Sequence, residues 1–152
     1  MVKQLFESHL DVSNLERSMA FYESAVGLEL GVKEGDRRIA FYWVGGPMKT
    51  MLGLWEERHA PIPPRHIAFE VDLEDLEPAI ARLSQLGIVT KDFFGRSGAE
   101  PTVLAWMPAV SIYFDDPDGH LLELIARLPG DPQPGRGILP WSEWKRGDVV
   151  ER

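Results

Sequence analysis

The chain has 152 residues, 44% of them hydrophobic, and a formal net charge of −8 at pH 7. Its length suits one compact domain or two small modules that share a core. It contains no cysteine, so disulfide bonds, thiolate metal sites and a cysteine nucleophile are excluded. The negative charge argues against binding nucleic acid through a broad basic surface, although a local cluster of Arg or Lys could still bind an anionic substrate.

Neither a membrane span nor a signal peptide is evident. No apolar run approaches the roughly 20 residues that cross a bilayer. The N-terminal residues also lack the apolar stretch and cleavage site of a signal peptide. We therefore expect a soluble, cytoplasmic protein without a membrane or nucleic-acid partner.

The first third of the chain has the pattern of a strand, a helix and three further strands. Residues 5–12 indicate the first strand. Ser13, with Glu16 three residues on, fits a capping box at the start of a helix, and Gly27 is a typical helix end. Three strand-like segments follow, at residues 28–32, 38–44 and 50–55.

The same order recurs in the second half. Residues 66–71 indicate a strand, Asp72 is expected to cap the next helix and Gly87 to end it. Three more strands are predicted, at residues 88–93, 109–114 and 121–126.

These elements predict an α+β fold built from two tandem βαβββ modules. The first module covers residues 1–58 and the second covers residues 59–128. A long loop at residues 94–108 replaces a short hairpin turn in the second module, and loops of this length are often functional. The Pro/Gly-rich tail, residues 129–152, is expected to be extended, with two tryptophans that pack on the body or on a partner chain.

An internal repeat accompanies this duplication. Residues 47–54 align without gaps on residues 117–124, and Gly53 then stands opposite Glu123. The first strand of each module carries a histidine, His9 in the first and His66 in the second. The side chains of His9, His66 and Glu123 at these repeat-related places suggest a metal site in which one ligand position is vacant.

Each candidate ligand has an ordinary alternative. A lone histidine in a strand is usually structural or solvated. Glu123 interrupts an apolar strand, where a covered carboxylate costs several kcal/mol unless it is paired or bound to a cation, although the face could be solvated. Two imidazoles and one carboxylate suit Fe, Mn, Zn, Ni or Co as divalent ions and leave coordination positions open.

Other candidates are weaker. His120 is three residues from Glu123, so strand alternation puts the two on opposite faces. His59 sits in a proline-rich link and is expected to be exposed. Glu56 or Glu57 could replace the missing acid only if the register slipped. No GxSxG, P-loop or GxGxxG motif is present, so a nucleophilic serine mechanism is unsupported.

The chain resembles the vicinal oxygen chelate superfamily, which includes glyoxalase I, fosfomycin-resistance proteins, extradiol dioxygenases and bleomycin-resistance proteins. The likeness covers about residues 4–127. It is carried by His9 in the first strand, the segment 15–22 leading to Gly27-Leu28, His66 followed by Ile-Ala-Phe-Glu-Val, and the segment 115–120 ahead of Leu122-Glu123.

The resemblance implies a curved sheet around a cleft, with His9, His66 and Glu123 as ligands of one divalent metal. A fourth ligand of glyoxalase I-like members would fall at Gly53, so the chain departs from that pattern towards an open three-ligand centre. The resemblance also implies a homodimer and bidentate chelation of a small oxygen-rich substrate, in a lyase, isomerase or dioxygenase reaction.

Roles for further residues follow from the same resemblance. Glu123 and Tyr113 would be catalytic, with Glu70 and Asp11 as weaker candidates for a base. The pocket would be shaped by Tyr42, Trp55, Trp106 and Arg96. Core packing is the stronger alternative for Tyr42 and Trp55. Arg96 would contact an anion, although loop arginines are usually solvated.

Two other functions compete with the metalloenzyme. The first is a drug-sequestering protein of the bleomycin-resistance type without catalysis, favoured by the acidic charge and the tryptophans. The second is an interaction module with a vestigial triad, in which the segment 141–144 docks a partner.

Overall fold

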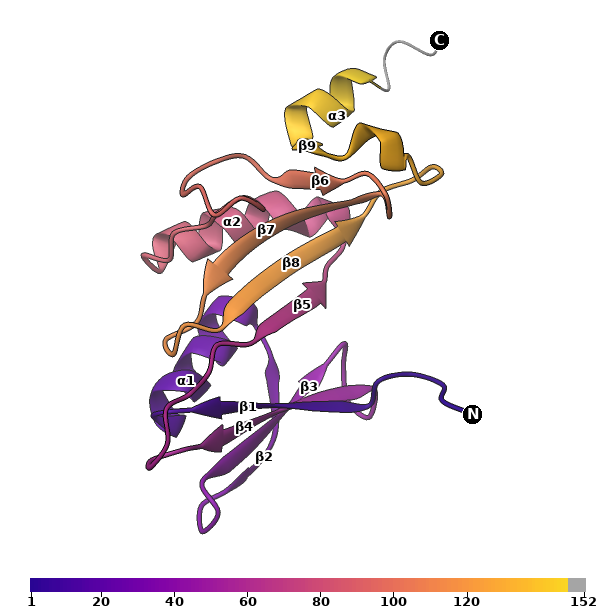
Figure 1. The fold of residues 1–152 in the computed structure, drawn as a ribbon. Coiled ribbons are helices and arrows are strands. Elements are labelled where there is room, and N and C mark those ends of the chain that lie inside the picture. Colours follow the sequence, from indigo (N-terminus) through magenta and orange to yellow (C-terminus); the bar gives the residue numbers. More distant parts are fainter. Residues whose placement is uncertain (148–152) are drawn as a thin grey trace. The chain divides into compact units, whose positions relative to one another are not determined.

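The computed structural model describes residues 1–147, which form two compact units. The first unit contains Met1–Arg65 with Asp116–His120, and the second contains His66–Asp115 with the chain from Leu121 onward. Each unit has its own mixed sheet, of four strands in the first and five in the second, with helices packed on it (Figure 1). The predicted α+β fold of two βαβββ modules is confirmed.

In the first unit, the sheet has the strand order β1-β4-β3-β2, and β1 runs parallel to β4. Residues alternate along β1, so Leu10 and Val12 are buried while Glu7, His9 and Asp11 are turned to the other face. The elements are β1 (Glu7–Val12), α1 (Leu15–Phe21) continued by a π-helical turn (Tyr22–Val26), β2 (Glu29–Glu34), β3 (Ile39–Val44) and β4 (Thr50–Glu56).

The start of α1 differs from the capping-box prediction. Asn14 is the N-cap, and its side chain accepts a hydrogen bond from the backbone N–H of Arg17 at 2.9 Å. Ser13 instead donates its backbone N–H and its hydroxyl to the carboxylate of Asp118. Both residue types can cap a helix, and the competing acceptor at Asp118 takes Ser13 out of that role. Gly27 ends the helix in the left-handed conformation, as predicted, with φ of 80°.

The second unit repeats the parallel pairing of its first and last module strands, β5 with β8, in the order β5-β8-β7-β6-β9. The helix is preceded by a 3-10 turn, Leu73–Asp75, and the side chain of Asp72 makes no capping hydrogen bond. The elements are β5 (His66–Glu70), α2 (Leu76–Gln85), β6 (Thr102–Leu104), β7 (Ala109–Asp115), β8 (Leu121–Arg127), β9 (Ile138–Pro140) and α3 (Trp141–Gly147).

The predicted strand at residues 88–93 is wrong, and the predicted loop at residues 94–108 contains β6 instead. Lys91 alone forms isolated bridges, to Tyr113 and Ser97. The reason lies at Asp92, whose carboxylate accepts the backbone N–H groups of Phe94 and Arg96 and so turns the chain. The side chains of β6 are buried, and this strand is the second strand of the module, at the place of β2 in the first unit.

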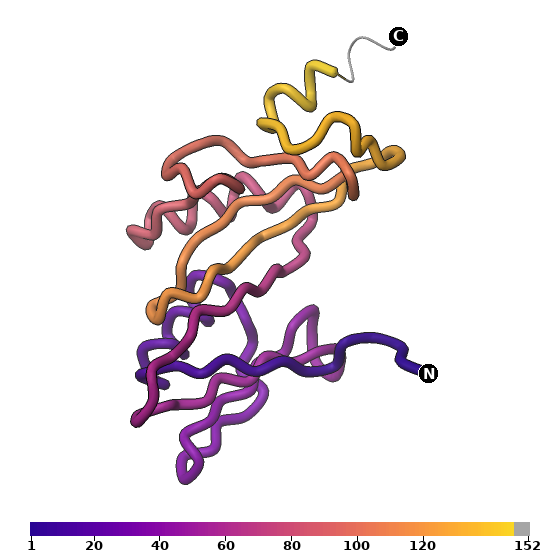
Figure 2. The backbone as a smooth tube through the Cα atoms, in the orientation of Figure 1, coloured from indigo at the N-terminus to yellow at the C-terminus, as the bar shows by residue number. Residues whose placement is uncertain are grey.

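The tail is folded where the structure describes it, which corrects the expectation of an extended segment. β9 pairs antiparallel with β6, and α3 follows directly, as the chain trace in Figure 2 shows towards its yellow end. Trp144 is only 3% exposed, and the guanidinium of Arg136 lies 4.4 Å from its ring centroid. The remaining tail residues, 148–152, lie outside the described part of the chain.

Within residues 1–147, no helix has both the length and the apolar character that crossing a membrane requires.

Candidate metal centre

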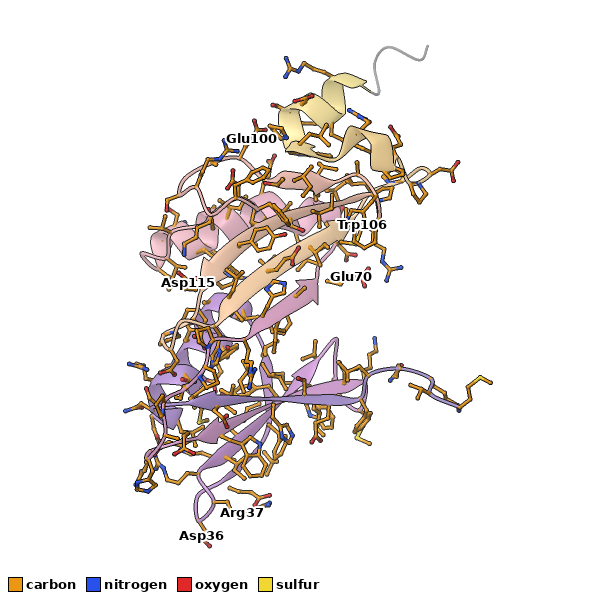
Figure 3. The ribbon with its side chains drawn as sticks, in the orientation of Figure 1. Asp36, Arg37, Glu70, Glu100, Trp106 and Asp115 are labelled. Atoms are coloured by element: carbon orange, nitrogen blue, oxygen red, sulfur yellow. The ribbon has the colours of Figure 1, made fainter. Side chains whose placement is uncertain are left out.

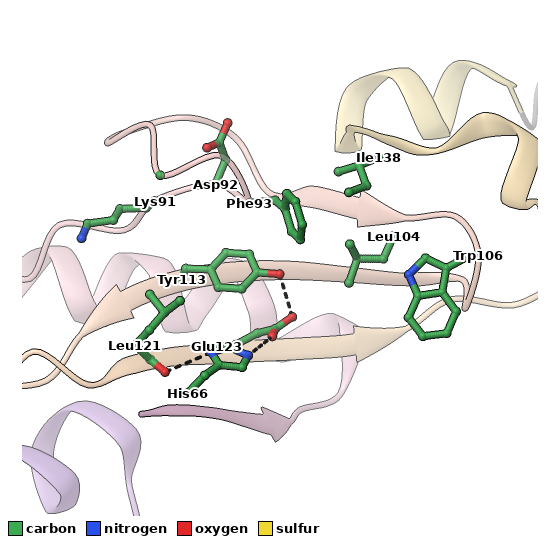
Figure 4. Close-up of a pocket in the computed structure, with 11 residues that line it drawn as sticks. His66, Lys91, Asp92, Phe93, Leu104, Trp106, Tyr113, Leu121, Glu123 and Ile138 are labelled. Carbon is green, nitrogen blue, oxygen red and sulfur yellow. Dashed lines mark hydrogen bonds and ion pairs between the residues drawn. The ribbon is translucent and has the colours of Figure 1, made fainter. Parts of the chain in front are cut away.

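A cavity of about 340 Å³ lies on the exposed face of the second unit's sheet (Figure 4). Its floor is formed by His66 of β5, Tyr113 of β7 and Glu123 of β8. Apolar side chains from β6, β9 and the connecting loops complete the wall, chiefly Phe93, Leu104, Trp106 and Ile138. Such a mixture of apolar walls and a few convergent polar groups is typical of small-molecule sites.

Glu123 is the polar centre of this cavity, although it is only 5% exposed. Its Oε2 lies 3.0 Å from Nε2 of His66, and its Oε1 accepts a hydrogen bond of 3.0 Å from the hydroxyl of Tyr113. The strand register explains both contacts. Tyr113 of β7 stands directly opposite Glu123. Ala68 of β5 stands opposite Glu123 on its other side, and His66 lies two residues before Ala68, so its side chain is on the same face. A buried carboxylate is thereby paired at both oxygens.

The second ring nitrogen of His66 suits it to metal ligation. Nδ1 lies 3.2 Å from the backbone carbonyl of Leu121, to which an Nδ1–H donates. A ligating imidazole usually donates its other N–H to such a carbonyl. The lone pair of Nε2 then faces a carboxylate oxygen at 3.0 Å, a contact that needs a proton or a cation between the two atoms. An imidazole nitrogen and a carboxylate oxygen are ligand types that divalent metals take in proteins, so His66 and Glu123 would hold such an ion here.

Tyr113 holds its proton firmly. Burial raises the pKa of its hydroxyl, and the negative charge of Glu123 raises it further. Its ring also lies against that of His66, with 6.2 Å between the ring centroids. At neutral pH the hydroxyl is therefore a donor that orients Glu123.

The other predicted pocket residues fall in different places. Trp106 lines the cavity and is largely exposed at its edge (Figure 3). Arg96 does not line it, because Asp92 binds its guanidinium at 2.6 Å, and Arg96 lines a neighbouring cavity instead. Tyr42 is fully buried in the first unit and donates to Glu23 at 2.8 Å, so it belongs to the core.

His9 lies on the exposed face of the first unit's sheet. Its ring packs beside Trp55 and Phe41, with centroid distances of 5.2 and 5.7 Å. Its Nε2 lies 2.5 Å from Oε1 of Glu7. His9 stands opposite Gly53 in the neighbouring strand, where an added Cβ would lie 2.8 Å from Cδ2 of His9. A larger residue at position 53 would therefore force the imidazole of His9 to move.

No three His, Asp or Glu side chains gather into a single metal-binding group among residues 1–147. Each unit instead presents one contact between a histidine and a glutamate, Glu7–His9 in the first and His66–Glu123 in the second. The two remaining histidines are placed as expected: His59 is exposed, whereas His120 is fully buried and contacts the backbone of Asp11 and Arg65.

The chain matches a known protein family. The model of the Glyoxalase/Bleomycin resistance protein/Dioxygenase superfamily matches residues 8–124. The chain belongs to this superfamily. The predicted resemblance to vicinal oxygen chelate proteins is thus confirmed.

Individual superfamily members extend the match over most of the chain. "Glutathione transferase FosA" of Serratia marcescens is 33% identical over 134 residues, covering 82% of this chain and 81% of the relative. "Metallothiol transferase FosB" of Lysinibacillus sphaericus is 35% identical over 117 residues, 74% of either chain. The crystal structure of an integron cassette protein from the Halifax Harbour sewage metagenome is 37% identical, with a TM-score of 0.71 over 82% of this chain and 99% of its own.

Sequence reasoning missed several residues of the candidate cavity and the equivalence of Glu7 with His66. Phe93, Leu104 and Ile138 line the cavity because the fold brings a turn, β6 and the tail to one place, and no motif marks them. The equivalence of Glu7 with His66 could have been recognised from the sequence. An alignment that matches Asp11-Val12 with Glu70-Val71, rather than His9 with His66, sets Glu7 opposite His66.

Proposed function

We propose that this chain is a divalent-metal-dependent enzyme that binds a small oxygen-rich substrate in the cavity of the second unit. His66 and Glu123 would hold the metal, and His9 would supply a further ligand. The observation that carries the proposal is the 3.0 Å contact between Nε2 of His66 and Oε2 of Glu123, with Nδ1 of the same ring directed at a backbone carbonyl.

A homodimer is part of this proposal. The side chains of His9 and His66 are 42% and 48% exposed, so both are accessible to groups outside their own unit. We propose that His9 of one copy joins the His66–Glu123 pair of another, as the superfamily resemblance implies. Mixing a His9→Ala chain with a Glu123→Ala chain would test the arrangement. Mixed dimers would then contain one intact site, and metal binding that neither variant shows alone would support sharing.

The residues of the cavity have defined tasks in this proposal. A divalent ion bound there would act as a Lewis acid towards negative charge on a substrate oxygen. The Tyr113 hydroxyl keeps Glu123 oriented, and its raised pKa keeps it protonated at neutral pH, so it donates a hydrogen bond and does not act as a base. The aromatic walls at Phe93 and Trp106 would limit the access of water to the bound substrate.

The reaction class is proposed from the relatives' names. A lyase, an isomerase or a dioxygenase would each use a chelated oxygen substrate. The names glutathione transferase and metallothiol transferase add a fourth class, in which a thiol is transferred to the bound substrate. Activity assays should therefore include a small-molecule thiol as cosubstrate.

Metal analysis after purification without chelators tests the proposal. We expect wild-type protein to retain about one divalent ion per site, and His66→Ala and Glu123→Ala to lose it. His59→Ala is the matched control, because His59 is exposed and lies outside the pairs. Equal metal content in the two ligand variants and the wild type would contradict the proposal.

A drug-sequestering protein is the second candidate. The apolar, aromatic wall of the cavity favours it, since such a wall can bind a flat organic cation without a metal. Titration of metal-free protein with bleomycin would separate the two functions. Tight stoichiometric binding that is unchanged in Glu123→Ala, with no turnover, would favour sequestration.

A further inference from the structure

The Pro/Gly-rich tail extends the sheet of the second unit by one strand. The first unit's sheet ends at β2, whereas in the second unit β9 is added beyond β6, which stands at the place of β2. β9 pairs antiparallel with β6 over three residue pairs. The superfamily model matches residues 8–124, so this strand lies outside the matched region. The tail is therefore a feature of this chain that the family match does not account for.

The alternation of side chains along β9 decides which of them faces the cavity. Leu139 stands opposite Val103 of β6, and both are nearly fully buried in the core. Ile138 stands opposite Leu104, and both line the cavity. Because successive side chains of a strand point to opposite faces of the sheet, the register that buries Leu139 directs Ile138 to the cavity.

Contacts on both sides of β9 fix the strand in this position. Just before it, the carbonyl of Gly137 accepts the backbone N–H of Ala105 at 3.1 Å. Just after it, the carboxylate of Glu100 accepts the backbone N–H of Ser142 at 2.7 Å and its hydroxyl at 2.9 Å. The nearly fully buried ring of Trp144 anchors α3. The side chain that β9 turns to the cavity is thus a fixed part of its wall.

The cavity has a polar floor and an apolar end. The floor holds the His66–Glu123 pair, where oxygen atoms of a substrate would bind in the proposed function. The apolar end is formed by side chains of a loop, β6, the turn after β6 and the tail, which are Phe93, Leu104, Trp106 and Ile138 (Figure 4). Phe93 and Trp106 are 45% and 58% exposed, and large apolar side chains that stay exposed together are typical of a binding surface. This end therefore suits an apolar group of the substrate.

The composition and size of this end indicate the kind of apolar group. Two of its four side chains are aromatic, and aromatic rings pack favourably against each other edge to face or offset. The whole cavity has a volume of about 340 Å³, near the lower end of the roughly 300–1,000 Å³ of small-molecule sites. Part of that space is needed for the oxygen-bearing group above the floor. The remainder suits a single aromatic ring.

We infer that the substrate carries an aromatic ring next to its chelating oxygen atoms, and that Ile138 of the tail selects for this ring by closing the apolar end of the cavity. The inference rests on the proposed function, because a metal at His66 and Glu123 would hold the oxygen atoms. The tail is then a specificity element that this chain adds to the superfamily fold.

Three 2-hydroxy acids serve as probes of the apolar end. Glycolate, mandelate and 3-phenyllactate share the hydroxyl and carboxylate oxygens that can chelate a metal, but only the last two carry a phenyl ring, at different reach. Calorimetric titration of the Mn(II)-loaded protein measures each dissociation constant. We expect the better of the two aromatic acids to bind at least about 10-fold more tightly than glycolate, because its ring loses contact with water. Equal affinities, or no binding by either aromatic acid, would overturn the inference.

Substitutions at Ile138 test the role of the tail. Ile138→Ala should weaken binding of the better aromatic acid about 4-fold, the loss that one methylene of buried contact brings, and should leave glycolate binding unchanged. Ile138→Trp should fill the apolar end and remove the preference for the ring. Leu86→Ala is the matched control, because Leu86 is an exposed apolar residue at the end of α2 and does not line the cavity. An unchanged preference for the ring in either Ile138 variant would contradict the inference. Urea unfolding identifies a misfolded variant, and Ile138→Phe then replaces a misfolded Ile138→Trp.

The two proposals fail in distinguishable ways. The metal content of the wild type and of Glu123→Ala tests the proposed function without involving Ile138. If the wild type holds no divalent metal, the proposed function fails and the inference falls with it. If the wild type holds the metal and Glu123→Ala loses it, while the aromatic acids bind no better than glycolate, the inference alone fails.

Discussion

The two sheets of this protein share a backbone plan but differ in the side chains of their exposed faces. In the second unit a buried glutamate receives a tyrosine hydroxyl, faces a histidine and stands opposite an alanine. In the first unit a glycine replaces the glutamate, a phenylalanine the tyrosine and a histidine the alanine. The comparison shows that both copies of a duplicated fold can present an imidazole beside a carboxylate, although different strands provide these groups in the two copies.

The opposite faces of the sheets are less exchangeable, because they pack against helices. Leu10 and Leu54 in the first unit and Phe69 and Leu124 in the second are all nearly fully buried. These positions keep their apolar character in both copies, since a polar group there would lose its hydration. Divergence between the units is therefore concentrated on the face that is free to carry chemistry.

The ion-pair cluster around Glu56 in the first unit has no acidic residue at the equivalent position of the second unit. The side chain of Glu56 is 3% exposed, binds the guanidinium of Arg38 and accepts the backbone N–H of Leu15 at the start of α1. When the gapless repeat is continued along β4 and β8, the equivalent position in the second unit is Ala126. The hydrogen bond from Arg38 lowers the pKa of Glu56 to about 2, against the cost of burial.

Among these variants, the largest change in the free energy of unfolding is expected from Glu56→Gln. Because the folded pKa of Glu56 lies below its unfolded value, its stabilisation is present above about pH 4.3 and is lost as the pH falls towards 2. We expect Glu56→Gln to reduce the free energy of unfolding by about 2–3 kcal/mol at pH 7 and by much less at pH 3. Urea unfolding at both pH values, with the exposed Glu29→Gln as control, measures this. An equal loss at both pH values would show that charge is not the cause.

A smaller effect is expected from adding a methyl group at position 53. Gly53→Ala should cost about 1–2 kcal/mol of stability, because the new Cβ meets Cδ2 of His9 at 2.8 Å and Cε1 of Phe41 at 2.9 Å. In a His9→Ala background the cost should fall, since one of the two neighbours is removed. A double-mutant cycle in urea checks the coupling, and strictly additive costs would contradict the close packing of His9 over Gly53.

The smallest effect is expected from Tyr113→Phe, which gives the second unit the aromatic residue of the first. Loss of the 3.0 Å hydrogen bond to Glu123 should cost about 1 kcal/mol of stability and weaken metal binding about 10-fold. Phe41→Tyr is the matched control, because no carboxylate stands opposite Phe41 and no gain in affinity is expected. Chelator competition measures both variants. Unchanged metal affinity in Tyr113→Phe would remove Tyr113 from the metal centre.

Much of the fold could be predicted from local patterns. Alternating apolar residues, helix-ending glycines and the Asp-Pro-Asp-Gly turn located most strands and both module helices. The error at residues 88–93 arose because a short apolar run can be a strand or a turn, and the Asp92 carboxylate decides for the turn through hydrogen bonds that periodicity does not reveal. The folded tail was missed because β9 is stabilised by pairing with β6, far away in the sequence.

The sequence by itself was sufficient to predict the superfamily, to reveal the duplication and to select His66 and Glu123 as candidate site residues. These follow from residue types and spacings that a linear repeat displays. Only the tertiary structure decided the partners of Glu123, the burial of Tyr42, the binding of Arg96 by Asp92 and the register that sets Glu7, rather than His9, at the place equivalent to His66. The physical reason is that shifting a strand by two positions leaves the same side chains on the same face, so alternation alone cannot distinguish the two registers, whereas the hydrogen bonds between neighbouring strands allow one register.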